Sequence, residues 1–151
     1  MPSHKETRHV PFSASDMFAL VAAVEKYPEF LPWCQGARVR SREIAGDKEI
    51  LLADLLIAYK MFRERFTSRV TADKAAMTVD ADYVKGPFHH LDNHWHFEPA
   101  ENGCFVHFSV DFEFKSRTLE ALIAGVFAKA VDRMVEAFIE RAYVLYGEGA
   151  N

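Results

Sequence analysis

The chain has 151 residues, half of them hydrophobic and thirteen of them Phe, and a formal net charge of −4 at pH 7. This length predicts a single domain, residues 1–151, with one sizeable core. No apolar run approaches the roughly 18 residues needed to cross a bilayer, and residues 1–10 lack the apolar core of a secretory signal. We therefore expect a cytoplasmic protein. The acidic balance argues weakly against general nucleic-acid binding, and two cysteines, Cys34 and Cys104, are too few for a disulfide framework, so we expect free thiols.

The N-terminal part of the chain predicts an edge strand followed by two short helical segments. Residues 4–12 alternate as a strand does, and Pro11 suits a sheet edge. Ser13 and Asp16 resemble a capping box with Asp in place of Glu, and an apolar helical face follows them. In residues 27–34, two prolines forbid a long helix while the aromatic side chains favour burial. We expect a short helical turn pressed into the core.

A series of strands comes next, joined by short turns. Alternating hydrophobicity predicts strands near residues 37–42, 50–59, 62–70, 77–83, 93–98 and 104–114. The pair Asn102-Gly103 suits a tight turn. Residues 50–59 are apolar on both parities, which predicts either cover on both faces of the sheet or an exposed patch. Because short connections join antiparallel neighbours, we expect a largely antiparallel sheet.

A long helix is predicted for residues 116–146, where apolar residues recur at helical spacing. At about 1.5 Å per residue, some thirty residues span on the order of 45 Å. Gly125 in its middle costs about 1 kcal/mol relative to alanine, so we expect a hinge or a close approach there. The stripe consists of Leu119, Leu122, Ile123, Val126, Phe127, Ala130, Val131, Met134, Val135, Phe138, Ala142 and Leu145.

These elements predict an α+β fold in which a curved antiparallel sheet wraps around the long C-terminal helix. The apolar faces of the strands need a partner longer than either short helix, and the last helix is the candidate of sufficient length. A strongly curved sheet around a helix often leaves a space between the two layers. The many Phe, Leu, Met and Trp residues would make that space apolar.

Arginines and one acidic residue give the predicted sheet two further features. Asp54 is the single charge in its strand, and we expect an outward position or an ion pair with a flanking arginine rather than a catalytic acid. If the third strand lies between the second and fourth, six arginines form a basic outer surface able to meet anionic lipid or ribosomal RNA. A solvated face paired with nearby glutamates explains them equally well. The residues are Arg38, Arg40 and Arg42, Arg63, Arg65 and Arg69, with Glu43, Glu49 and Glu64 as the glutamates.

Histidines gather near the last hairpin, at His89, His90, His94, His96 and His107. Those at 94 and 96 share one parity, which could place both on one metal ion. That parity is the outward one, opposite the inward aromatic side chains, so we expect surface histidines without a metal. No Ser/His/Asp arrangement, nucleophile elbow or Gly-rich phosphate loop is present, and we expect no catalytic residues.

Four stretches of the chain carry a resemblance to a known family. Residues 24–34 have the sequence Val-Glu-Lys-Tyr-Pro-Glu-Phe-Leu-Pro-Trp-Cys, residues 66–70 are Phe-Thr-Ser-Arg-Val, residues 86–88 are Gly-Pro-Phe, and residues 134–138 are Met-Val-Glu-Ala-Phe. Together with Leu91, Trp95 and Phe97, they resemble the coenzyme Q-binding protein family. The order of elements resembles the helix-grip fold of the START-like superfamily, to which that family, a ribosome-association toxin and polyketide cyclases belong.

The resemblance implies a sheet of about seven strands, two short helices after the first strand, and binding of ubiquinone or a related isoprenoid quinone or late precursor. The protein would act as a non-catalytic carrier or chaperone supporting respiratory electron transfer. Ordinary core packing is the alternative role for the same side chains. We expect the quinone near an entrance formed by Tyr27, Phe30, Leu31, Pro32 and Trp33, under a lid formed by Val131, Met134, Val135 and Phe138, with Phe66, Phe88, Trp95 and Phe108 as further contacts.

Two other functions remain open at this stage. The resemblance also fits a toxin-like protein that binds the large ribosomal subunit and blocks subunit association, and, less well, a polyketide-type cyclase or aromatase. A quinone carrier would make peripheral contact with the inner face of the cytoplasmic membrane. No cofactor is expected apart from the quinone ligand, and the oligomeric state does not follow from these residues.

Overall fold

The computed structural model describes residues 3–59 and 62–147. All seven predicted strands are present. Six are longer than the alternation indicated, whereas the first, predicted for residues 4–12, ends earlier, at Val10. They are β1 Ser3–Val10, β2 Cys34–Ala45, β3 Lys48–Tyr59, β4 Phe62–Asp73, β5 Thr78–Lys85, β6 Phe88–Ala100 and β7 Gly103–Phe114. The helices are α1 Ala14–Ala22, the 3₁₀-helix η1 Val24–Glu29, α2 Arg117–Asp132, α3 Met134–Ala142 and the π-helical turn η2 Tyr143–Gly147.

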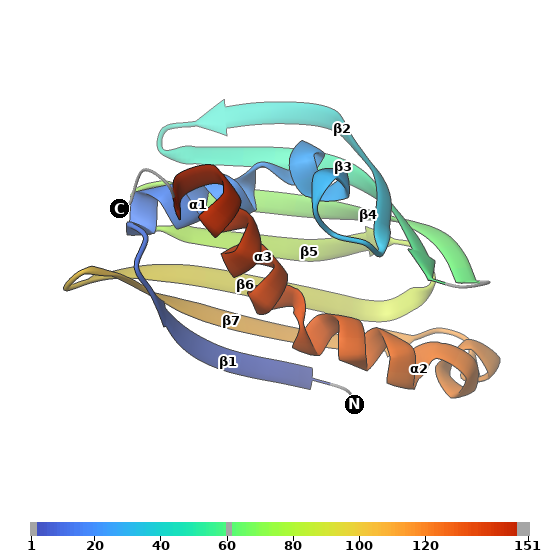
Figure 1. Ribbon diagram of the computed structural model, residues 1–151. Coiled ribbons are helices and arrows are strands. Elements are labelled where there is room, and N and C mark those ends of the chain that lie inside the picture. Colours follow the sequence, from blue (N-terminus) through green and yellow to red (C-terminus); the bar gives the residue numbers. More distant parts are fainter. Residues whose placement is uncertain (1–2, 60–61, 148–151) are drawn as a thin grey trace.

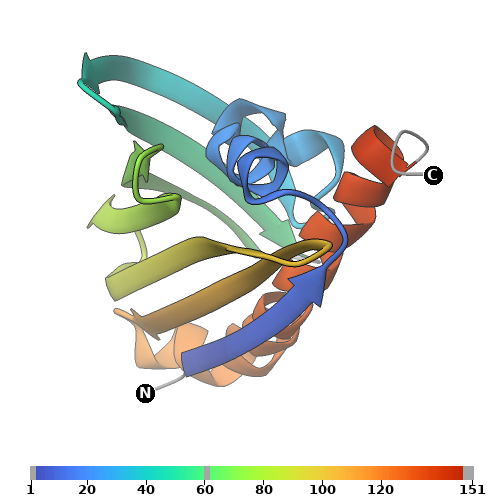
Figure 2. The ribbon, with the colours of Figure 1, turned by 90° about the vertical axis from the view of Figure 1, so that its left-hand side faces the viewer.

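The strands form one antiparallel sheet in the order β1-β7-β6-β5-β4-β3-β2 (Figure 1). From β2 to β7 each strand pairs with its sequence neighbour, as short turns require. The first strand returns to pair with β7, so Val10 lies opposite Cys104. Figure 2 shows that the sheet curves and that α1, η1 and α3 lie on its concave side. This arrangement confirms the predicted α+β helix-grip fold.

The two short helices after β1 form as expected. Ser13 is the N-cap of α1, and its hydroxyl accepts a hydrogen bond from the backbone N–H of Asp16 at 3.0 Å. The second segment is a single 3₁₀ stretch that contains Pro28. The turn between β6 and β7 places Asn102 at φ 62° and Gly103 at φ 146°. Both Cys34 and Cys104 are buried free thiols.

The prediction of one continuous helix over residues 116–146 was wrong. The chain breaks at Arg133, which has φ −99° and ψ 2°, and its backbone N–H bonds to the carbonyls of both Lys129 and Ala130. A straight helix could not follow the curved sheet, so α2 packs near β7 while α3 turns toward α1 (Figure 1). The break is therefore not at Gly125, where an added Cβ would meet nothing within 4 Å.

Part of the predicted apolar stripe of the helix lies outside the described part of the chain. In α2, the side chains of Leu119, Leu122, Ile123, Val126 and Phe127 lie outside the described part of the chain. The later positions of the stripe are described. Val131, Val135, Phe138 and Ala142 are buried in the core, whereas Leu145 is 48% exposed.

The prediction that Arg38, Arg40 and Arg42 share one face of β2 was also wrong for the third arginine. A bulge between Val39 and Ser41 shifts the register, so Arg42 lies opposite the inward residue Leu51. Its guanidinium then reaches Glu49 at 2.9 Å and, from η1, Glu25 at 3.9 Å.

The two faces of the sheet have opposite character. Inward residues form the core with the helices, and Phe88, Phe97, Phe108, Phe112 and Phe138 are among its largest fully buried side chains. The outward side chains of β3 at positions 50, 52 and 56 are only partly exposed, although none of the described helices covers that face (Figure 2).

Candidate functional site

A cavity of about 80 Å³ lies between the sheet and the helices. Five strands, β3 to β7, supply one wall, because alternate residues on each strand point inward. The opposite wall, which we call the helix wall, comes from η1, from the segment before β2, and from the junction of α2 and α3. The sheet wall consists of Leu55, Ile57, Phe66, Ser68, Val70, Val79, Ala81, Leu91, Asn93, Trp95 and Val110, and the other wall of Val24, Tyr27, Trp33, Val131 and Met134.

The polar groups of this cavity are few and fixed in place. The amide of Asn93 accepts a hydrogen bond from the indole N–H of Trp95 at 3.0 Å and donates from Nδ2 to the carbonyl of Ser109 at 3.1 Å. Ser68, which is 4% exposed, donates its hydroxyl proton to the carbonyl of Asp82 at 3.1 Å. Tyr27 donates to the carbonyl of Val21. No charged side chain lines the cavity in the described part of the chain.

Burial keeps the neighbouring ionisable groups neutral. The pKa of the Tyr27 phenol is raised, chiefly by burial and then by the nearby Cys34 and Glu25. Burial also raises the pKa of the Cys34 thiol to about 11, and a backbone hydrogen bond at Gly36 opposes that shift. At neutral pH the cavity and its surroundings therefore present neutral groups to a ligand.

An aromatic cluster closes one end of the helix wall. Tyr27 and Phe30 each meet Phe138 of α3 edge-on, with ring centroids 5.3 and 5.1 Å apart. Arg141, one turn further along α3, contacts Glu29 at 2.6 Å and lies 5.4 Å above the Phe30 ring. These contacts join η1 to α3, so the short helix and the last helix form one wall.

Six of the predicted ligand-contacting residues line the cavity: Tyr27, Trp33, Phe66, Trp95, Val131 and Met134. The other seven do not. Leu31, Phe88, Phe108, Val135 and Phe138 are buried core around it, Phe30 packs on its outer side, and Pro32 is exposed. That any of these residues contacts a quinone stays a prediction.

Sequence reasoning missed the two polar residues of the sheet wall, Ser68 and Asn93. A signal was present, because Asn93 shares the inward parity of Trp95 and Phe97 on its strand. A single polar residue on an inward parity marks a position where the core needs, or tolerates, a hydrogen-bonding group.

A chain of polar contacts between β1 and the last two helices joins the α2–α3 junction to the edge of the sheet. His4 of β1 contacts Glu6 at 2.7 Å through Nε2 and Asp132, the last residue of α2, at 3.1 Å through Nδ1. Arg8 contacts Glu6 at 3.3 Å and Glu136 of α3 at 3.6 Å. Two of the cavity residues, Val131 and Met134, lie on either side of the break that this network spans.

The outer face of β2 to β4 is basic. Arg40 contacts Asp54 at 3.7 Å, and Asp54 also accepts a hydrogen bond from Thr67 at 2.6 Å, which confirms the predicted ion pair. Four other arginines share this face and make no ion pair or hydrogen bond with any described residue: Arg38, Arg63, Arg65 and Arg69. We call these five arginines the arginine face.

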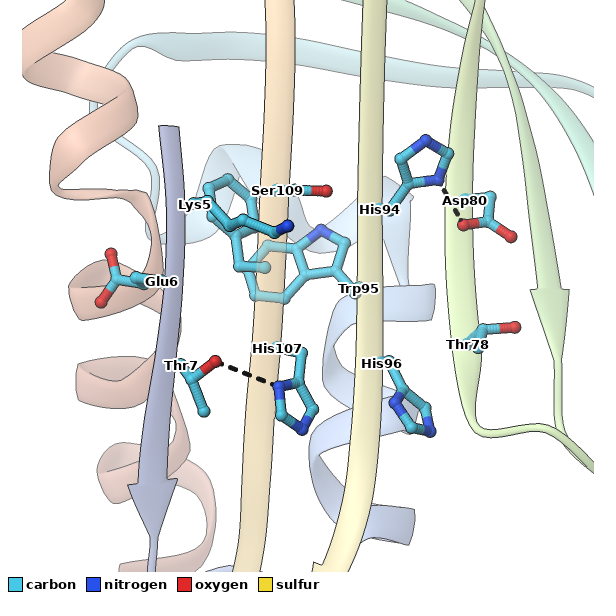
Figure 3. Close-up of a pocket in the computed structure, with 11 residues that line it drawn as sticks. Lys5, Glu6, Thr7, Thr78, Asp80, His94, Trp95, His96, His107 and Ser109 are labelled. Carbon is cyan, nitrogen blue, oxygen red and sulfur yellow. Dashed lines mark hydrogen bonds and ion pairs between the residues drawn. The ribbon is translucent and has the colours of Figure 1, made fainter. Parts of the chain in front are cut away.

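A second hollow, of about 360 Å³, lies on the outer face of β1, β7, β6 and β5 (Figure 3). His107 stacks on His96 at 5.5 Å, receives or donates a hydrogen bond at Thr7, and contacts Glu98 at 2.9 Å. Nδ1 of His94 forms a hydrogen bond with Oδ1 of Asp80 at 2.6 Å. Among the residues that the structure describes, no three His, Cys, Asp or Glu side chains converge on a point that could hold a metal ion.

A model of the family described as polyketide cyclase / dehydrase and lipid transport matches residues 10–139. The chain belongs to this family. A member from Rickettsia prowazekii, named ribosome association toxin RatA, is 32% identical over 145 residues, which cover 94% of this chain and 97% of the relative. The mitochondrial coenzyme Q-binding protein COQ10 of Drosophila melanogaster is 33% identical over 136 residues, which cover 87% of this chain and 54% of the relative.

Solved structures place the polyketide cyclase / dehydrase and lipid transport family in the START-like group of folds. A START superfamily protein from Mycobacterium smegmatis superposes with a TM-score of 0.78 over 95% of this chain and 98% of the other, at 17% identity. This likeness shows the fold alone. In the described part of the chain, no helix is long and apolar enough to cross a membrane.

Proposed function

We propose that the protein binds a neutral isoprenoid quinone, ubiquinone or a late precursor, and carries it without catalysing a reaction. The observation that supports this function best is the cavity between the sheet and the helices, whose wall is apolar with a few neutral polar groups. An isoprenoid tail gains roughly 0.8 kcal/mol for each buried CH₂ group. A fatty acid would bring a carboxylate into a wall that offers no cation, which is costly.

The size of the cavity adds a mechanical requirement. Ligand pockets commonly measure about 300–1,000 Å³, whereas this cavity measures about 80 Å³. A quinone therefore has to displace part of the wall. The helix wall at Val131 and Met134 is the better candidate, since it lies at the helix break, whereas backbone pairing between neighbouring strands holds the sheet wall.

Cavity-filling substitution tests the quinone function directly. A decyl-tailed ubiquinone analogue should quench tryptophan fluorescence and raise the melting temperature of the wild type. Ala81→Phe, which places a ring in the cavity, should abolish both effects. Val84→Phe on the same strand is the matched control, because Val84 is 42% exposed and does not line the cavity. If the wild type shows neither quenching nor stabilisation, or if no quinone copurifies from the native host, the proposal fails.

A second candidate function is association with the ribosome, as the name of the RatA relatives states for those proteins. We propose the large subunit as the partner. The arginine face favours it. Four of its five guanidinium groups lack a partner among the described residues, although the whole protein is acidic. Such groups are suited to the phosphates of ribosomal RNA.

Salt dependence tests the ribosomal candidate. Cosedimentation with isolated large subunits should weaken steeply with added salt, and Arg65→Gln/Arg69→Gln should reduce the slope of log K against log salt by about 1 for each arginine. Lys5→Gln/Lys129→Gln removes the same charge from other elements and should leave the slope nearly unchanged. Salt-insensitive cosedimentation would remove this candidate.

Gene deletion distinguishes the two candidates in the cell. A respiratory defect that added ubiquinone rescues supports the quinone function, and peripheral contact with the membrane would follow because isoprenoid quinones reside there. Normal respiration with altered subunit joining supports the ribosomal function. A cyclase is the weaker third candidate, because the described cavity wall holds no carboxylate, imidazole or amine to act as a general acid or base.

A further inference from the structure

The amide of Asn93 has its orientation set by two partners of opposite type. The Trp95 indole N–H can only donate, so the atom that it contacts at 3.0 Å must be the amide oxygen. The Ser109 carbonyl can only accept, so the atom at 3.1 Å from it must be the amide nitrogen. The amide cannot flip without breaking both bonds.

These two hydrogen bonds leave the second N–H of Asn93 as a donor at the wall of the cavity. An Asn side chain has two N–H donors, and Ser109 takes one of them. The second N–H has no partner among the described residues. The two hydroxyl groups of the cavity wall do not offer a further donor, since Ser68 already donates to the Asp82 carbonyl and Tyr27 to the Val21 carbonyl.

We propose that Asn93 is the residue that selects the head group of the ligand, and that it favours an oxidised ring with carbonyl oxygens over the reduced ring with hydroxyls. This proposal rests on the quinone-binding function. A carbonyl oxygen accepts the free N–H of Asn93 and brings no proton that needs a partner. A quinol brings two hydroxyl protons. The backbone carbonyls at Val21, Asp82 and Ser109 already accept hydrogen bonds, which leaves only the hydroxyl oxygens of Ser68 and Tyr27 as further acceptors for them.

The test is calorimetric titration with the decyl-tailed ubiquinone analogue and, under argon, with its quinol. The wild type is expected to bind the oxidised form about tenfold more tightly, the effect of roughly one hydrogen bond. The midpoint potential of the bound two-electron couple should then lie about 30 mV below that of the free couple. Asn93→Leu, of similar size, should lose the preference. Asp92→Asn, its exposed outward neighbour, should keep it.

The outcomes of this titration distinguish the proposed role of Asn93 from the quinone-binding function on which it rests. If the wild type binds both redox forms with equal affinity, the role of Asn93 is overturned while quinone binding stands. The same conclusion follows if Asn93→Leu still prefers the oxidised form. Because the comparison of redox forms uses the wild type, the proposal remains testable even if the Leu variant folds poorly. Binding of neither form overturns the proposed function itself.

Discussion

Gly86 shows how a single residue can fix the wall of the cavity. It lies at φ +148°, and an added Cβ would come within 2.6 Å of the Cβ of Phe66, a cavity residue. Only glycine adopts this backbone conformation next to another strand without strain. The Gly-Pro-Phe sequence at residues 86–88 is therefore explained by close packing of the β5–β6 connection on β4.

Two alanine substitutions compare this glycine with the one in α2. Gly86→Ala should destabilise the protein by more than about 2 kcal/mol, because both the backbone angle and the contact are unfavourable. Gly125→Ala should stabilise it by up to about 1 kcal/mol, since an added methyl group there meets nothing within 4 Å. Urea unfolding measures both. Ligand exchange should be unchanged by Gly125→Ala because the helix breaks at Arg133; slower exchange would restore Gly125 as the hinge.

Asp54 illustrates what the sequence can predict about a residue. Its position in an apolar run indicated either a buried acid or an outward partner of an arginine. The structure confirms the second, because the carboxylate lies on the outer face between Arg40 and Thr67. Parity along the strand was sufficient for this prediction. Asn93 shows the limit of such prediction. The alternation along its strand does not indicate that Trp95 and Ser109 hold its amide in one orientation.

At the scale of elements, the sheet was predictable and the helix break was not. Strand parity and short turns specify neighbours and faces for β2 to β7. The break at Arg133 has neither Pro nor Gly, so its cause is tertiary: two helical segments follow the curve of one sheet. The bulge in β2 could not be predicted from the sequence either, because arginines at 38, 40 and 42 continue to alternate while Arg42 lies on the other face.

The cavity also lies beyond sequence prediction. Periodicity shows which side chains point inward, but the volume between two layers depends on their separation and on how each side chain fills it. This explains why Phe108 and Phe138, which share the parity or helical face of lining residues, are packed in the core instead.

The network from β1 makes a prediction about the α2–α3 junction. Glu6→Gln removes the charge that joins His4 and Arg8, so α2 should be held less tightly. The network is partly exposed, and we expect a loss of only about 0.5–1 kcal/mol in global stability. Amide hydrogen exchange in α2 should become faster, and so should dissociation of the quinone analogue in stopped-flow fluorescence.

Lys5→Gln is the matched control for that experiment, because Lys5 is an exposed, outward neighbour on the same strand. It should leave both rates unchanged. If α2 keeps its protection in Glu6→Gln, the apolar contacts of residues such as Val131 are sufficient to hold the junction, and the ionic network does not control access to the cavity.

For the molecule as a whole, the sheet separates two surfaces of different chemistry. Alternate residues of β3 and β4 contribute Leu55, Ile57 and Phe66 to the cavity and, on the opposite side, carry Arg65 and Arg69. A partner bound to the arginine face would not cover the helix wall through which a ligand has to pass. The two proposed functions would therefore be compatible in one protein, and substitutions on each side of the sheet would test each proposal separately.

The buried thiols and phenol predict how global stability depends on pH. Burial raises the pKa of Cys34 and of Cys104 to about 11, and also raises that of Tyr27. The folded state thus binds more protons than the unfolded state above the unfolded thiol pKa of about 8.5. The stabilisation is fully present below about pH 8.5 and is lost as the pH rises toward 11, by roughly 1–3 kcal/mol for each thiol.

Urea unfolding at intervals between pH 7 and 11 measures this loss. In Cys34→Ala/Cys104→Ala the stability at pH 7 should be somewhat lower, because two buried side chains become smaller, but its decline between pH 8.5 and 11 should be shallower than in the wild type. Burial also raises the pKa of Tyr27, Tyr83 and Tyr146, so these phenols contribute to the remaining slope, and Tyr27→Phe should flatten it further. An identical decline in the wild type and the double variant would show that the thiols are ionised, or accessible to water, in the folded protein.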